Sequence, residues 1–472
     1  MSQPDKTNTQ PPRPAPGGAQ PGASFHFDAN LPLDERFDVV VAGGGPAGVA
    51  AAAAAAREGA KTLLVEASGC LGGMGTAALV PSWAPFGDGQ KIIYRGLAER
   101  IFRQCRAAMP HIAADRLDWV PIDPEYLKRV YDALVQEHGV EVLFHTRLAS
   151  VWRGRRGDMD GGVIMLTGKS GLSAVKAGVY IDCTGDADLA AWAGAPTGTG
   201  DGPEIKPMPA TLCFMLCNVD TGAYERGPAL GVNNPGSPIH AIVDSGLYPL
   251  IDDTHIIGNI LAPGVVGFNA GHLYEVDGTD PATVSRGMAA GRAKAAQFRD
   301  ALARFHPEAF GRAFLVETAP LMGIRDSRRV TGDYMLTADD YMKRRTFPDE
   351  IARNCYYLDV HPASPRESRG IKAFEKFQQG TFCYGPGESH GIPYRCLTPR
   401  GLRNVLVAGR CISADRAVQS SVRVMPACLA TGEAAGAAAA IAADRHGGDV
   451  RAVDVAGLRA RLRGHGAWLP ET

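Results

Sequence analysis

The first part of the chain alternates between short apolar runs and glycine-rich breaks, and this alternation predicts a strand, a helix and a second strand. Residues 37–42 form an apolar run rich in valine, which is typical of a buried parallel strand. Glycines interrupt the run, residues 49–57 predict a helix made almost wholly of alanine, and Gly59 closes that helix. Residues 61–65 predict the second strand, so the segment is expected to form a βαβ unit of about thirty residues.

Similar patterns return further along the chain. Residues 123–138 predict an amphipathic helix, with Pro124 in its first turn and Gly139 after its end. Alternating segments between 148 and 177 predict a β-meander. Further strands are predicted at 140–145, 179–183, 210–217 and 404–408, and further helices at 281–305 and from about 426 to 445.

The βαβ pattern stands at both ends of the chain and a different pattern fills the middle, which predicts one nucleotide-binding domain interrupted by an insertion. We expect a disordered tail over 1–35, because its first part is rich in Pro, Gln, Gly and Thr and nearly free of large aliphatic side chains. The nucleotide-binding domain is expected to combine 36–205 with 395–446. An α+β substrate domain is expected over 206–394, and a C-terminal extension over 447–472.

Composition and charge exclude several classes of protein. The chain has 49 Lys and Arg against 50 Asp and Glu, so its formal net charge of -1 argues against a nucleic-acid surface and a polybasic membrane anchor. The ten cysteines include no CxxC pair, and the amino-terminal segment lacks the apolar core of a secretory signal, so we expect a cytoplasmic protein. Because the longest apolar runs are too short to cross a bilayer, we expect no membrane span.

A glycine-rich turn between the first predicted strand and helix carries the strongest chemical signal. The sequence GGGPAG over 43–48 fits G-x-G-x-x-G, and Glu66 ends the next predicted strand. In this context the glycines admit a pyrophosphate beside the helix amino terminus, and the carboxylate accepts hydrogen bonds from ribose hydroxyls. An ordinary surface acid is the alternative for Glu66. The expected dinucleotide-binding residues are Gly43, Gly45, Pro46, Ala47, Gly48 and Glu66.

Several other segments resemble known flavoproteins. Residues 71–76, 181–186 and 402–410 are similar to the remaining signatures of FAD-binding folds of the glutathione reductase type. The chain also resembles the FAD-dependent oxidoreductase family that includes flavoproteins related to the A subunit of heterodisulfide reductase. The segments that carry this resemblance are 66–76, 324–334, 391–397 and 422–426. It implies an α/β fold in which a Rossmann-like FAD domain with a β-meander is interrupted by an α+β domain. It extends the expected FAD-binding residues to Gly72, Gly73, Met74, Thr76, Thr184, Gly185, Asp186, Gly409, Arg410, Arg423 and Met425.

The resemblance also implies how the cofactor is held. The turn 423–426 would direct the amino terminus of the last long helix at the N1/O2 edge of the flavin, where its dipole stabilises negative charge; a plain core helix is the alternative. Relatives of the succinate dehydrogenase type attach FAD through a histidine after the paired glycines. Because no histidine follows Gly73 closely here, FAD is expected to be non-covalent. A 4Fe-4S cluster is implied by family association alone, since Cys213-x-x-x-Cys217 is the closest cysteine spacing.

Candidate catalytic residues come from the inserted region and from its return to the FAD domain. Arg325, Arg328 and Arg329 form a basic cluster suited to clamp a carboxylate or phosphate, with surface solvation or ion pairing as the alternative. His390 lies on a Gly/Pro-rich loop that we expect over the flavin, where an imidazole suits proton removal from an alcohol; an ordinary loop histidine is the alternative. Tyr394 is expected to orient substrate or flavin. Weaker candidates without a surrounding motif are His255, His272 and His361.

Together these patterns predict an FAD-dependent oxidoreductase that transfers hydride between a small polar metabolite and flavin N5. No second G-x-G-x-x-G lies between 186 and 400, so the other electron carrier is expected to be a second substrate, a redox partner protein or a quinone, with NADH docking left open. A flavin-dependent isomerase or hydratase and an electron-relay subunit of a larger complex are the alternatives. No metal site is expected.

Overall fold

The structure is a computed structural model, and it describes residues 26, 28–113, 115–154, 159, 161–199, 207–370, 372 and 382–471. Most of the predicted tail, residues 1–25 and 27, lies outside the described residues. The last part of that tail is a strand, because β1 (Leu33–Ala42) begins four residues before the predicted Phe37.

A seven-stranded sheet forms the centre of the larger unit, and it confirms the predicted α/β class. Its order is β3-β2-β1-β6-β5-β4. The seventh strand, β15, pairs with the carboxyl-terminal end of the long strand β6, whereas β5 pairs with the amino-terminal part of β6. The strands β3, β2, β1, β6 and β15 run parallel, whereas β4, β5 and β6 form the predicted antiparallel meander. Ala42 is in register with both Val65 and Asp182, so several strands end at one edge. The other bounds are β2 (Thr62–Val65), β3 (Glu141–Leu143), β4 (Arg147–Trp152), β5 (Val163–Gly168), β6 (Gly171–Asp182) and β15 (Val405–Val407).

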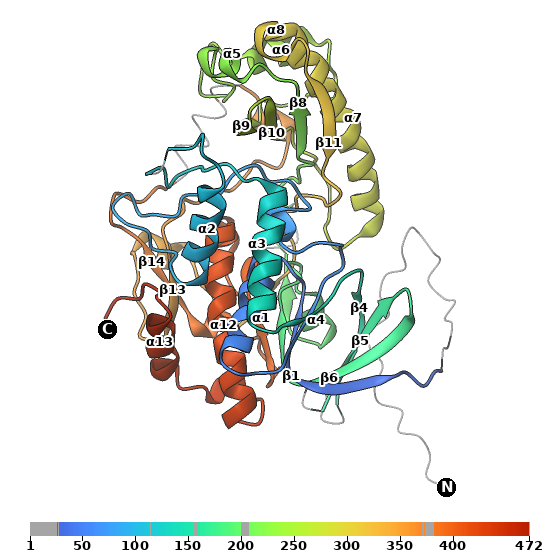
Figure 1. Ribbon diagram of the computed structural model, residues 1–472, viewed down its shortest axis with the longest axis vertical. Helices are drawn as coiled ribbons and strands as arrows, with labels where there is room; N and C mark the ends of the chain where they lie inside the picture. The colour runs from blue at the N-terminus through green and yellow to red at the C-terminus, as the bar shows by residue number, and fades with distance from the viewer. Residues whose placement is uncertain are drawn as a thin grey trace.

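Two alanine-rich helices, α1 (Pro46–Arg57) and α12 (Met425–Arg445), pack side by side on this sheet (Figure 1). Their glycines allow a close approach: a Cβ on Gly432 would lie 2.1 Å from the Ala47 carbonyl oxygen. By length and composition α12 is apolar enough to cross a membrane, but 89% of its most apolar window is buried inside the protein. The neighbouring helices are α2 (Leu97–Ala107), α3 (Pro124–Glu137) and α13 (Val455–Gly464).

A smaller unit stands at the top of Figure 1 and has its own apolar core. Its antiparallel sheet has the order β11-β8-β10-β9, and the long helix α7 (Pro281–Phe305), which coincides with the predicted helix, packs against it. Phe298 of α7 stacks on Phe214 of the sheet, so helix and strands share one core. The other elements are β8 (Phe214–Cys217), β9 (Ile256–Ala262), β10 (Val265–Ala270), β11 (Phe314–Thr318), α5 (Thr221–Arg226), α6 (Pro238–Ser245) and α8 (Pro307–Phe310).

The predicted carboxyl end of the insertion at residue 394 lies too late. Val330, Tyr341, Ile351 and Ile392 already pack in the core of the larger unit. The reason is that β13 (Glu350–Asn354) pairs with β14 (His390–Pro393) against that core. Short elements in this part of the fold are α4 (Asp188–Trp192), β7 (Thr197–Gly198), β12 (Arg329–Val330), α9 (Ala338–Met342) and α11 (Arg416–Val422).

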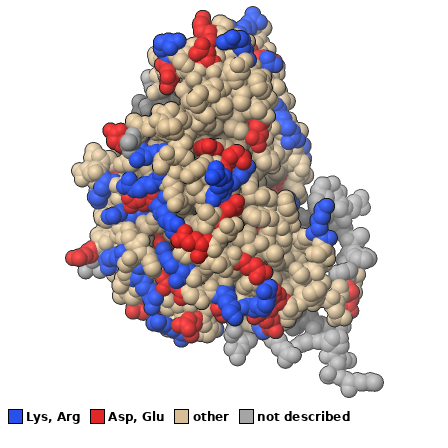
Figure 2. Space-filling view, in the orientation of Figure 1, with Lys and Arg blue, Asp and Glu red and all other residues tan. Residues whose placement is uncertain are grey.

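Charges of both signs are interspersed over the larger unit on the face shown in Figure 2. This distribution agrees with the nearly balanced charge of the sequence.

Candidate active site

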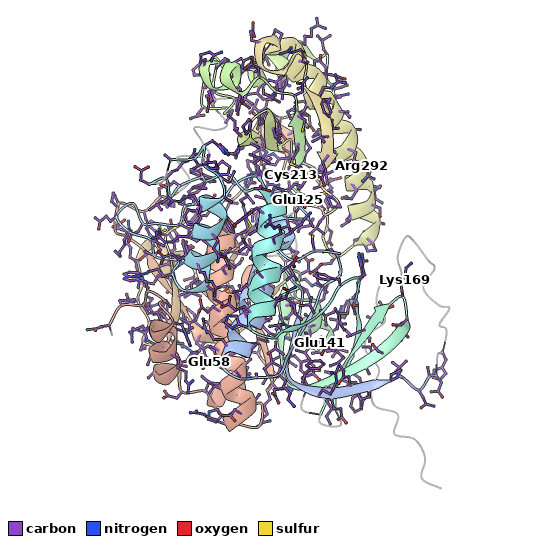
Figure 3. All side chains as sticks on the ribbon, in the orientation of Figure 1. Glu58, Glu125, Glu141, Lys169, Cys213 and Arg292 are labelled. Carbon is purple, nitrogen blue, oxygen red and sulfur yellow. The ribbon has the colours of Figure 1, made fainter. Side chains whose placement is uncertain are left out.

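A single cavity of about 860 Å³ runs from the glycine-rich turn after β1 to the smaller unit. Its walls come from the carboxyl edge of the large sheet, the start of α12, the small sheet and the segment around 356–362. Cys213, which lines the cavity, lies in Figure 3 where the two units meet. A volume this large is at the upper end of the range for small-molecule pockets, so it has room for an extended ligand.

The glycine-rich turn fits a pyrophosphate. Gly43 has a φ of +97°, and a Cβ there would lie 2.5 Å from the Cys183 carbonyl oxygen. Gly45 borders the cavity, and a Cβ at this position would meet nothing within 4 Å. Gly45 is also the N-cap of α1 and provides no side-chain hydrogen bond to the first turn. The first N–H groups of α1 therefore remain suited to an anion, with Pro46 and Ala47 on the cavity wall. Gly48 serves packing instead, since its Cβ would lie 1.7 Å from the Gly43 carbonyl oxygen.

Glu66 lies at the cavity wall, directly after β2, and is already fixed by the backbone. The Gly44 N–H donates to its Oε2 at 2.7 Å, and the Ser68 N–H donates to its Oε1 at 2.6 Å. A carboxylate offers about four acceptor positions, so both oxygens retain capacity for ribose hydroxyls. The two backbone donors hold the carboxylate in one orientation towards the glycine-rich turn.

The second glycine loop is tied to the first, because the Gly72 N–H donates to the Gly44 carbonyl oxygen at 2.8 Å. Gly73 and Met74 line the cavity. Thr76 does not: its buried hydroxyl donates to the Leu71 carbonyl oxygen at 2.6 Å and closes the loop. Gly72 is likewise a turn residue, with a φ of +107°.

Thr184, Gly185, Gly409 and Arg410 also line the cavity, with Thr184 next to Gly43 and Gly409 next to Ala47. Asp186 lies outside the lining, because the Arg410 guanidinium donates to its carboxylate at 2.7 Å. Arg410 also donates to the Gly185 carbonyl oxygen at 2.8 Å and to the Ile324 carbonyl oxygen. The arginine thus joins the loop after β6 to the chain that returns from the smaller unit.

The start of α12 reaches the cavity at Arg423, Val424 and Met425. Val424 is the N-cap and its side chain makes no capping hydrogen bond. The helix therefore presents free backbone donors and the positive end of its dipole to the cavity, as the resemblance to FAD-binding folds implies. Arg423 donates to the Asp359 carboxylate at 2.9 Å.

The three arginines of the predicted basic cluster separate. Arg328 donates to the Asp186 carbonyl oxygen and forms an ion pair with Asp188, so it braces the larger unit and does not line the cavity. Arg329 pairs with Asp326. Arg325 alone lines the cavity, and its guanidinium is buried. Burial and the nearby Arg423 lower the pKa of Arg325 to about 10, so the group is cationic at neutral pH.

The predicted catalytic residues His390 and Tyr394 do not line the cavity. His390 is fully buried in β14, where its Nδ1 lies 2.9 Å from the Tyr384 hydroxyl. Burial lowers the pKa of His390 to about 3. Tyr394 donates to the Val450 carbonyl oxygen at 2.8 Å. The loop before β14 packs against the larger unit, away from the cavity, which removes the support for a direct role of these two residues.

Three histidines that carried no motif, His255, His272 and His361, gather instead on the cavity wall. Asp253 lies 3.1 Å from His272 Nδ1, and Asp359 lies 3.4 Å from His361 Nε2. Burial lowers the pKa of all three imidazoles, that of His361 to about 3. A signal was present in the sequence, because Asp253-Thr254-His255 and Asp359-Val360-His361 repeat the spacing Asp-x-His.

The fold and the lining of this cavity define a Rossmann-like dinucleotide-binding protein. Residues 38–462 match the family described as FAD dependent oxidoreductase, and the chain belongs to that family. It is therefore an enzyme with FAD as its cofactor, as the sequence predicted. The glycine cradle, Glu66 and the start of α12 fit that cofactor.

Comparison with curated proteins found no match. Among solved structures, a geranylgeranyl bacteriochlorophyll reductase-like protein from Thermoplasma acidophilum is 13% identical, with a TM-score of 0.42 over 92% of this chain and 85% of that one. The p-nitrophenol 4-monooxygenase PnpA from Pseudomonas putida DLL-E4 is 12% identical, with a TM-score of 0.36 over 64% and 71% of the two chains. CmlS, a flavin-dependent halogenase, is 12% identical, with a TM-score of 0.42 over 91% and 62%.

Proposed function

We propose that the protein oxidises or reduces a small polar metabolite that carries a carboxylate or hydroxyl groups, by exchanging a hydride with flavin N5. Bound FAD supplies a site that accepts or donates two electrons and a proton equivalent. The observation that supports the proposal is the continuity of one cavity, which joins the glycine-rich turn at Gly45 to a buried polar end around Arg325.

Arg325 suits the recognition of an anionic group. Its Nη1 donates to the Pro209 carbonyl oxygen at 2.7 Å and to Thr211 Oγ1 at 2.8 Å. Its Nη2 lies 3.3 Å from Asn269 Oδ1. A guanidinium has five N–H donors, so these three contacts fix its plane and leave capacity for a carboxylate in the cavity. In a buried setting such a charge-assisted contact contributes about 1.5–3 kcal/mol.

The test is anaerobic mixing of the FAD-loaded full chain with a panel of hydroxy acids, sugars, polyols and NAD(P)H, followed by stopped-flow absorption. Reduction of the visible flavin band by a carboxylated or hydroxylated compound is the expected result. Arg325→Met should then raise the substrate concentration needed for half-maximal reduction by about 10- to 100-fold, the equivalent of one charge-assisted hydrogen bond.

Arg292→Met provides the matched control, since Arg292 is exposed on α7 and is labelled in Figure 3. It should reduce at the rate of the parent protein. Turnover of a compound without net reduction would favour the isomerase or hydratase alternative. Inertness towards the whole panel, together with rapid reduction by a ferredoxin-like protein, would overturn the proposal in favour of electron relay.

A further inference from the structure

The histidine cluster on the cavity wall is held in one arrangement by two carboxylates. His272 Nδ1 lies 3.1 Å from Asp253 Oδ2, which also accepts from the Tyr274 hydroxyl at 3.0 Å. His361 Nε2 lies 3.4 Å from Asp359 Oδ1. Each carboxylate favours an N–H on the imidazole nitrogen that faces it, so these contacts select the tautomer of both rings.

The remaining nitrogens of these two rings face each other. His272 Nε2 lies 3.0 Å from His361 Nδ1. Two neutral imidazoles carry two N–H groups between them, and three contacts compete for those protons. When both N–H groups point at Asp253 and Asp359, the two inner nitrogens present lone pairs to each other. Two facing lone pairs repel each other unless a cation lies between them. A metal ion is such a cation, because both imidazole lone pairs can bind it directly.

His255 adds a third donor beside this pair. One nitrogen from each of the three rings lies within 4.8 Å of the others. The His255 ring lies against the His272 ring at a centroid distance of 4.2 Å, and among the described residues its buried Nδ1 has no hydrogen-bond partner. Tetrahedral Zn–N bonds of about 2.0–2.1 Å place ligand nitrogens about 3.3 Å apart, so a rotation of the His255 ring completes a three-nitrogen site.

The surroundings resemble a catalytic metal centre in two respects. Two of the three imidazoles have a carboxylate behind them, the outer-shell arrangement that orients metal-binding histidines. The three rings also border the cavity, which leaves room for a fourth ligand. The carboxylates of Asp253 and Asp359 offset the positive charge of Arg325 and Arg423 close by.

We propose that His255, His272 and His361 bind one divalent transition-metal ion, of which Zn²⁺ is the reference case, with an open position facing the cavity. Neutral imidazoles suit Zn²⁺ and its first-row neighbours, whereas Mg²⁺ and Ca²⁺ prefer oxygen ligands. A cation here would polarise a substrate oxygen next to Arg325. Metal binding itself does not depend on the proposed hydride exchange.

The experiment measures metal binding to the FAD-loaded full chain after removal of metals with a chelator. Zn²⁺ is titrated in equilibrium dialysis with elemental analysis, and Co²⁺ is titrated while its ligand-field bands are recorded beyond the flavin absorption. We expect saturation at one ion per chain. His255→Ala should weaken Zn²⁺ binding more than about 100-fold, because loss of an outer-shell partner alone costs about 10- to 100-fold. Asp253→Asn should fall within that smaller range.

His465→Ala is the control, because this exposed histidine pairs with Glu58 at the end of α13, away from the cavity. It should bind Zn²⁺ as the parent protein does. The FAD content of every variant is measured in parallel, so that a variant that fails to fold is recognised by loss of flavin. His255→Ala is chosen for this reason, since the buried Nδ1 of His255 has no hydrogen-bond partner within the described residues that its loss would leave unpaired.

The proposal would be overturned if the parent protein bound neither Zn²⁺ nor Co²⁺. It would also be overturned if a flavin-replete His255→Ala protein bound them as tightly as the parent protein does. The same holds if a strongly deshielded proton resonance shows that the His272–His361 pair shares a proton in metal-free protein and excludes added Zn²⁺. A protein that binds Zn²⁺ but reduces no substrate would contradict the proposed function alone.

Discussion

Gly432 lies where α12 crosses the first turn of α1, and its replacement by alanine offers a sharp test of how the cofactor site is built. A Cβ at this position would lie 2.1 Å from the carbonyl oxygen of Ala47, against 3.4 Å or more for an ordinary contact. These two atoms must therefore move apart by 1.3 Å, the difference between those distances, which displaces one helix against the other. The Ala47 carbonyl oxygen belongs to the backbone, and the position of a Cβ is fixed by its own backbone, so no side-chain rotation relieves the overlap.

The expected loss of stability follows from two opposing effects. Alanine in a helix is favoured over glycine by about 1 kcal/mol. Overpacking in a tight core costs up to about 3 kcal/mol when the backbone has to move. We therefore expect the free energy of unfolding of Gly432→Ala to fall by about 2 kcal/mol. Because Ala47 lines the cavity, the same movement should weaken FAD binding by about tenfold or more, the equivalent of one displaced charge-assisted hydrogen bond.

Urea unfolding at a fixed FAD concentration, followed by circular dichroism and flavin fluorescence, measures both effects; the concentration must be fixed because a ligand shifts apparent stability. Gly464→Ala is the matched control, since a Cβ at this helical glycine would meet nothing within 4 Å. The control should equal the parent protein or gain up to about 1 kcal/mol. Wild-type stability and FAD affinity in Gly432→Ala would refute the argument.

Three further outcomes are expected. Glu66→Gln should lower the affinity for FAD by about 10- to 100-fold, because it removes a charged acceptor of the Gly44 N–H. The variant should therefore lose FAD on gel filtration, and full retention of FAD would contradict the role of the carboxylate. His390→Asn should flatten the acid side of the stability profile. Burial lowers the pKa of His390 to about 3 in the folded protein, against an ordinary 6.5, so only the unfolded chain takes up this proton as the pH falls. Through this group the free energy of unfolding of the parent protein falls by about 2 kcal/mol between pH 6.5 and about 5. If the free energy of unfolding of both proteins changed equally with pH in this range, the role of His390 in the acid sensitivity would be refuted. Glu433→Gln should lower the free energy of unfolding by about 3–5 kcal/mol, since Arg57 then keeps a buried charge without its carboxylate at 2.9 Å; a loss under about 1 kcal/mol would contradict the pairing.

Most of the nucleotide-binding half was predictable because its signals are local. An apolar run, a glycine turn and an alanine helix stand next to one another in the sequence, and α1 and β2 follow from them directly. The smaller unit carried weaker signals. Its strands are short, they pair across helices, and β9 and β10 lie between turns that interrupt any long periodicity. The boundary at 394 was wrong for the same reason, because the pairing of β13 with β14 is not a local property.

The candidate site likewise combines residues from one local motif with residues that come from distant segments. Gly43, Gly45 and Glu66 belong to one compact motif, and the structure places all three at the cavity. The polar end is assembled from segments far apart in the chain, and only tertiary packing brings His272 and His361 within 3.0 Å. His390 lies away from the cavity, and a Gly/Pro-rich loop before a buried strand is as compatible with packing as with catalysis.

The contacts of Arg410 have a consequence for how the two units move. One guanidinium holds the loop at Gly185, the carboxylate of Asp186 and the carbonyl oxygen of Ile324, where the chain leaves the smaller unit. The smaller unit cannot tilt without breaking bonds to a loop that borders the cofactor cavity. By thermodynamic reciprocity, if a ligand of the smaller unit changes the affinity for the dinucleotide through these bonds, the dinucleotide changes the affinity for that ligand by the same factor.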